Sequence, residues 1–210
     1  MKAVSFNQLH SRSLRLWHWC TFVVVLLILY TVFTGKFYLN PWGTAPSIRR
    51  ALLKEGITIS NSQAFNAVND LSAGIWKWHQ YYGYVLSFLF LFRIILEFFQ
   101  PSEEKFFTRM RNSFFFMRSK EVKGGGHYFI VRTVYLLFYF LLATIVTTGL
   151  TMSFLKNRFS EEGMHEVKQI HESCFYFLLL FTLMHITGVL LAERKRYKNI
   201  VSGMIHGAKQ

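Results

Sequence analysis

The chain has 210 residues, of which 52% are hydrophobic and 18% aromatic, and the apolar residues fall in long unbroken runs. Runs of this kind favour membrane-spanning segments over a soluble core. The formal net charge of +13 is carried by basic residues that flank these runs instead of forming one stripe, which argues against a nucleic-acid partner.

Four apolar segments are long enough to cross about 30 Å of hydrocarbon, which takes about 20 helical residues. They cover residues 16–34, 79–99, 128–154 and 171–192. Because backbone groups in lipid must bond to one another, each segment is predicted to be a helix. The sequence therefore predicts an all-α fold, an integral membrane four-helix bundle that forms a single domain over residues 1–210.

The orientation follows from the lysines and arginines of the connections. Fourteen of them lie before the first span, between the second and third spans, and after the fourth, against eight in the other two connections. The positive-inside rule then predicts that both termini are cytoplasmic. The first span is too long for a signal peptide and is not followed by a small-residue cleavage site, so we expect it to be retained.

The longest connection, residues 36–78, lies on the outer side. It contains a predicted short helix over 47–54 with Ser47 as its N-cap. Long loops in compact proteins usually have a function, but this one can also be a cover for the membrane surface, anchored by its tryptophans. On the inner side, the glycines at 124–126 predict a flexible joint before the third span.

Four histidines lie in the predicted spans, and they pair by depth. His79 and His171 begin their helices at the outer side, whereas His18 and His185 lie toward the inner side. His171 and His185 are fourteen residues apart, so they share one face of a helix at a separation of roughly 21 Å. Ligand side chains inside a membrane are costly, and the two depth matches predict two metal sites, one above the other.

Two facing imidazoles per level fit a b-type haem better than zinc, because a porphyrin supplies the remaining four ligands. The chain has no C-x-x-C-H motif, so the haems are expected to be non-covalent. Gly83 follows His79 by about one turn, where a flat ring would approach the backbone. Ordinary helix packing is an equally good interpretation of that glycine.

Arginine in a span needs an anion, and Arg93 lies fourteen residues after His79, at the level of the inner site. We expect Arg93, together with Arg15 or Arg132, to pair with the propionates of the inner haem. The alternative is that Arg93 extends to the cytoplasmic headgroups.

Several short motifs at these positions resemble a known family. They are Arg15-Leu-Trp-His-Trp, His79 with Gly83, Thr148-Gly-Leu, and the pair His171 and His185. The chain resembles the bacterial di-haem cytochromes b that serve as membrane subunits of nickel-iron hydrogenases, formate dehydrogenases and thiosulfate reductases. The resemblance implies that His18 and His185 ligate the cytoplasmic-side haem and that His79 and His171 ligate the periplasmic-side haem.

The resemblance also implies a function. The expected role is electron transfer in the bacterial inner membrane, between a periplasmic dehydrogenase, hydrogenase or cytochrome subunit and the quinone pool, with the quinone near the inner haem. A stand-alone oxidoreductase that acts on a small donor or acceptor, such as a ferric chelate or superoxide, shares every motif. A haem-free structural or assembly subunit is a third possibility.

Overall fold

Helices make up nearly all of the secondary structure. The computed structural model describes residues 11–100, 105–118, 125–195 and 204, and no β-strand occurs among them. In chain order the elements are α1 (Arg12–Phe33), the π-helical turn η1 (Thr34–Tyr38), α2 (Pro41–Lys54), α3 (Asn61–Phe99), α4 (Phe106–Arg118), α5 (Gly125–Phe154), the 3-10 turn η2 (Lys156–Arg158) and α6 (Glu161–Lys195).

Four of these stretches are long and apolar enough to cross a membrane. They are Arg12–Tyr38, Asn61–Phe99, Phe129–Phe154 and Glu161–Leu191. The predicted all-α membrane fold is therefore confirmed. The cytoplasmic placement of the termini stays a prediction, and the basic N-terminal and C-terminal flanks lie mostly outside the described residues.

The chain consists of two compact units. Unit 1 comprises residues 1–20 and 88–210, and unit 2 comprises residues 21–87. Helices α1 and α3 contribute to both units. The single-domain prediction is left open by this division, and each unit is described by itself below.

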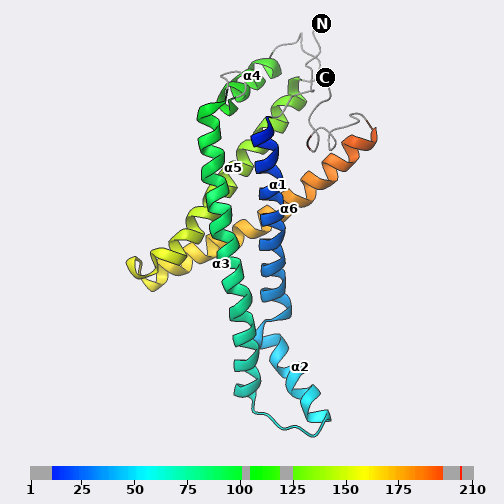
Figure 1. Cartoon of the computed structure of the whole chain (residues 1–210), viewed down its shortest axis with the longest axis vertical. Coiled ribbons are helices and arrows are strands. Elements are labelled where there is room, and N and C mark those ends of the chain that lie inside the picture. Colours follow the sequence, from blue (N-terminus) through cyan, green and yellow to red (C-terminus); the bar gives the residue numbers. More distant parts are fainter. Residues whose placement is uncertain (1–10, 101–104, 119–124, 196–203, 205–210) are drawn as a thin grey trace. The chain divides into compact units, whose positions relative to one another are not determined.

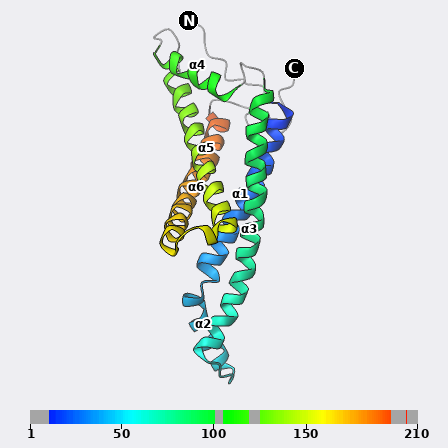
Figure 2. The same cartoon turned by 90° about the vertical axis from the view of Figure 1, so that its left-hand side faces the viewer.

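Unit 1 is built around α5. The short turn η2 joins α5 to α6, which runs back beside it, and α4 packs on α5 as well (Figures 1 and 2). Leu142 on α5 and Leu178 on α6 are fully buried, and the rings of Phe138 and Phe181 stack with centroids 4.5 Å apart. The predicted joint at residues 124–126 is wrong in part, because Gly125 and Gly126 belong to α5; Gly124 lies outside the described residues.

Unit 2 holds α2 against the first turns of α3. Buried Ala45 on α2 meets Ala64 and Val68 on α3 in a small apolar core. The predicted start of α2 at Ser47 is wrong: the helix begins at Pro41. Asn40 caps it by accepting a hydrogen bond of 3.1 Å from the backbone N–H of Trp42, and proline suits the first helical position.

Helix α3 begins at Asn61, eighteen residues before the predicted start at His79, so much of the expected outer loop is helical. A capping box sets this start. The hydroxyl of Ser60 accepts from the N–H of Gln63 at 3.1 Å, and the Gln63 side chain accepts from the N–H of Ser60 at 2.8 Å. Trp76 and Trp78 therefore lie on a helix and not in a loop. Likewise α6 begins at Glu161, ten residues before the predicted span.

Gly35 in η1 lies directly against the indole of Trp76. A Cβ added at Gly35 would meet Cε2 and Cζ2 of that ring at 2.9 Å, closer than real side chains approach. The glycine thus lets η1 and α3 pack together within unit 2.

We predict that Gly35→Ala destabilises the protein by about 1–3 kcal/mol through overpacking. Thermal unfolding in detergent is the measurement, with a lower midpoint expected. Gly43→Ala is the matched control, since a Cβ there meets nothing within 4 Å and alanine favours the helix. Equal midpoints for the two variants would contradict the packing role of Gly35.

Candidate functional site

Unit 1 brings two of the four predicted ligands together. The rings of His18 on α1 and His185 on α6 lie edge to face, with centroids 6.1 Å apart and an interplanar angle of 66°. When two imidazoles bind opposite sides of one metal, each metal–nitrogen bond is about 2 Å long and each ring centre lies about 1 Å beyond its nitrogen. The two ring centroids are then about 6 Å apart. The separation of the two rings therefore fits a bis-histidine metal site.

Aromatic rings surround this pair. The ring of Phe181 is parallel to that of His185, at 5.8 Å and 7°, and stacks on Phe138 from α5. The indole of Trp19 meets His18 edge to face at 5.6 Å. Such walls suit a flat, apolar macrocycle.

Arg15 lies one turn before His18 on α1. Its Nε and Nη1 atoms are buried and have no hydrogen-bond partner within the described part of the chain. Because a buried donor costs free energy until an anion or other acceptor pairs with it, Arg15 fits the predicted contact with a haem propionate.

Arg93 has partners within the protein. Its side chain is buried, donates from Nε to the hydroxyl of Tyr139 at 3.0 Å, and forms an ion pair with Glu97 at 3.0 Å. Its guanidinium also lies 5.8 Å from the ring of Trp17. The sequence reasoning missed Glu97 and Tyr139, although the Arg93–Glu97 spacing of four residues was a readable signal.

Glu97 extends this cluster to the next helix. Its second carboxylate oxygen accepts from the backbone N–H of Phe106, the first residue of α4. The ring of Phe106 also packs edge to face on Tyr139 at 5.5 Å. The cluster thus fixes where α4 begins. The contact of Arg93 with haem propionates stays a prediction. In such a contact the Arg93 guanidinium would bind both Glu97 and a propionate.

His171 on α6 is oriented by α5. The Oγ1 of Thr148 lies 2.9 Å from Nδ1 of His171 and 2.7 Å from the carbonyl oxygen of Thr144. A hydroxyl has one hydrogen, which goes to the carbonyl, so Oγ1 accepts from the imidazole N–H. That tautomer places the lone pair of His171 on Nε2, the nitrogen that a metal would bind.

His79 repeats this arrangement in unit 2. The hydroxyl of Thr31 on α1 donates to the carbonyl of Ile28 at 2.7 Å and lies 3.1 Å from Nδ1 of His79. By the same reasoning the lone pair of His79 is on Nε2. Sequence reasoning did not assign Thr31 a role, because a threonine in an apolar run has no pattern of its own.

Gly149 and Gly83 have different surroundings. A Cβ at Gly149 would lie 3.3 Å from Cε1 of His171, so this glycine lets the imidazole approach α5. A Cβ at Gly83 meets no described atom within 4 Å, and its carbonyl accepts from Ser87 at 2.8 Å. The role of Gly83 at a flat ring therefore stays a prediction.

The predicted placement of two histidines on one helix is seen in the structure. His171 and His185 both lie on α6, which is unbroken from Glu161 to Lys195. The pairing of His79 with His171 stays a prediction, because the two residues belong to different units. No group of three or more His, Cys, Asp or Glu that could hold a metal occurs among the described residues.

We predict that Arg93→Gln lowers the free energy of unfolding by about 2–4 kcal/mol, because Glu97, whose side chain is 19% exposed, would be left as an uncompensated, partly buried charge. Arg93→Gln with Glu97→Gln should recover part of the loss. The exposed pair Lys168 and Glu172, with N and O 3.9 Å apart, is the control, and Lys168→Gln should cost at most about 1 kcal/mol. Equal losses for the single and double variants would show that the ion pair does not matter.

Comparison with known protein families gives a match over most of the chain. The sequence model of a family described as prokaryotic cytochrome b561 matches residues 9–207, which include all four membrane spans. No curated protein and no solved structure matches the chain.

Proposed function

The chain belongs to the prokaryotic cytochrome b561 family, and on that premise we propose that it carries electrons through two b-type haems between a periplasmic redox partner and the quinone pool. Membership confirms the resemblance seen in the sequence motifs. It also establishes the coarser statements: the chain is a multi-pass protein of the bacterial inner membrane, and its family binds b-type haem and transfers electrons across the membrane.

The adjacent rings of His18 and His185, with centroids 6.1 Å apart, are the observation that carries the haem-mediated part of this proposal. They are the axial ligands we assign to the inner haem, and we assign Arg15 to a propionate there because its buried Nε and Nη1 atoms have no partner among the described residues. We assign His79 and His171 to the outer haem, and each has its Nδ1 within hydrogen-bond distance of a threonine hydroxyl. Haem iron, when bound, supplies the one-electron chemistry.

The residues of the chain then have distinct tasks. Thr31 and Thr148 orient the imidazoles of His79 and His171 by hydrogen bonds. The stacked rings of Phe138 and Phe181 cover one side of His185 with apolar surface. The roughly 21 Å between His171 and His185 along α6 separates the two levels. An electron that crosses this span moves with or against the membrane potential, at about 2.3 kcal/mol per charge per 100 mV.

A small soluble donor or acceptor in place of a protein partner is the second candidate. One observation favours it: an open, lysine-lined pocket lies in unit 2 beside Trp76, whose ring contacts that of His79 at 5.5 Å.

We predict two haems per wild-type chain and one in His18→Ala, with quinone reduction lost in that variant because the inner level is empty. Haem is counted by extraction and by reduced-minus-oxidised spectra. His165→Ala is the control: this exposed histidine lies on the same helix as His185 and bonds to Gln169 at 2.9 Å. Wild-type protein without a b-type spectrum would overturn the proposed function, and His18→Ala with two haems would overturn this ligand assignment.

We predict that Thr148→Val weakens haem retention at one site by about 10–100-fold, the range for loss of a hydrogen bond that orients a metal ligand. Competition with a haem-accepting apoprotein measures the loss, and the spectrum of the other haem should not change. Thr147→Val is the matched control, since that hydroxyl bonds to the carbonyls of Ala143 and Thr144 and is exposed. Identical retention in both variants would remove Thr148 from the site.

A further inference from the structure

Two tryptophans of α1 flank His18, and the proposed function does not use either of them. Trp17 precedes and Trp19 follows this histidine, within the motif Arg15-Leu-Trp-His-Trp. These residues and the partners described below all belong to unit 1. Successive residues of a helix point about 100° apart, so the side chains of Trp17, His18 and Trp19 leave α1 in three different directions.

Trp17 ties α1 to α3 and α5. The residue is 6% exposed, and its indole N–H donates to the backbone carbonyl of Leu89 on α3 at 2.8 Å. Its ring stacks on that of Tyr139 from α5, with centroids 6.4 Å apart and an interplanar angle of 30°. An indole N–H is a donor only, and a buried donor needs an acceptor, so this hydrogen bond is costly to lose. The direction of Trp17 is therefore fixed by two neighbouring helices.

Trp19 is held by a segment that is distant in the sequence. Its indole N–H donates to the backbone carbonyl of Met204 at 3.1 Å, although 185 positions separate the two residues. The same ring meets the His18 ring edge to face, with centroids 5.6 Å apart. Trp19 thus contacts His18 directly, while its own position is set by the C-terminal part of the chain.

Both acceptors are backbone carbonyls, and this affects how firmly α1 is held. A side-chain acceptor can change its rotamer, whereas the carbonyl of Leu89 is fixed by the hydrogen bonds of α3. Because Trp17 and Trp19 point to different sides of α1, rotation of this helix about its axis strains at least one of the two hydrogen bonds. The same rotation would move the His18 ring relative to that of His185, which lies 6.1 Å away. The two indoles therefore oppose the motion that would misalign the histidine pair.

We propose that Trp17 and Trp19 are positioning residues for His18. Their hydrogen bonds to backbone carbonyls fix the orientation in which this imidazole binds the inner haem. The inference rests on the proposed function, which assigns His18 to that haem. If the two indoles only packed α1 into unit 1, their loss would lower stability and leave the orientation of the ligand unchanged.

The test is electron paramagnetic resonance of the oxidised, full-length protein in detergent. The g-values of a low-spin haem with two histidine ligands depend on the angle between the imidazole planes, so they report how the ligands are oriented. The signal that is lost in His18→Ala belongs to the inner haem. Trp17→Phe and Trp19→Phe should each shift the largest g-value of this signal and the midpoint potential of the same haem. The signal of the other haem should not change.

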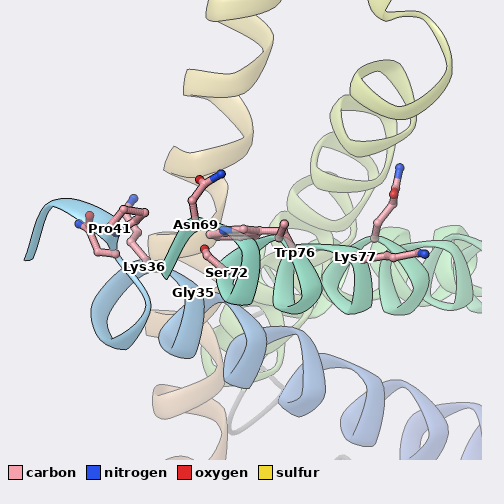
Figure 3. Close-up of a pocket in the computed structure, with 10 residues that line it drawn as sticks. Gly35, Lys36, Pro41, Asn69, Ser72, Trp76 and Lys77 are labelled. Atoms are coloured by element: carbon pink, nitrogen blue, oxygen red, sulfur yellow. The ribbon is translucent and has the colours of Figure 1, made fainter. Parts of the chain in front are cut away.

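Trp76→Phe is the matched control. The ring of Trp76 meets the ring of another histidine, His79, edge to face at 5.5 Å. Trp76 belongs to unit 2, where it lines an open pocket (Figure 3). This variant should leave the signal that depends on His18 unchanged. An equal shift of that signal in Trp76→Phe would show that loss of any indole changes it, and the positioning role would be wrong.

The remaining outcomes separate the inference from the proposed function. Unchanged g-values in Trp17→Phe and Trp19→Phe, with lower thermal unfolding midpoints, would assign the two indoles to packing alone and leave the proposed function standing. Should Trp17→Phe fail to fold, Trp19→Phe decides, because Trp19 is partly exposed. Wild-type protein without a low-spin haem signal would overturn both the positioning role and the proposed function.

Discussion

Hydrocarbon offers no hydrogen-bond partner, so every polar side chain within a span must be satisfied by the protein or by something that the protein binds. The two threonines beside the outer histidines show what this constraint does. The hydroxyl hydrogens of Thr31 and Thr148 go to carbonyls of their own helices. Each oxygen is then an acceptor, and the neighbouring imidazole must donate. The tautomer of each histidine thus follows from the helix backbone.

The same constraint separates the two arginines near the inner pair. Arg93 is matched within the protein by Glu97 and Tyr139, and this cluster reaches on to the first N–H of α4. Arg15 has buried nitrogen atoms that find no acceptor in the described part of unit 1. One arginine therefore organises the fold, and the other fits an anion that arrives with the cofactor. Because a buried ion pair adds little to net stability, the role of Arg93 is mainly to fix how α3, α4 and α5 contact one another.

Sequence reasoning found the four spans and placed His171 and His185 on one helix, because hydropathy and helical spacing are local properties. It also grouped His18 with His185, which unit 1 brings together. It did not find the contact of Thr31 with His79, since 48 residues separate them and depth alone does not choose between neighbouring faces. The start of α3 was missed for another reason: Asn61 to Lys77 is polar enough to resemble a loop, and it becomes helical through the Ser60 cap and packing on Ala45.

The length of α3 explains why that missed segment matters. Its 39 residues extend for about 58 Å at 1.5 Å per residue, whereas the hydrocarbon core is about 30 Å thick. The apolar run begins only after His79, so the earlier turns must lie in the interface and in water. A loop there would leave Lys77 and Trp76 without fixed positions. As part of a continuous helix they are held next to His79, where the apolar span begins.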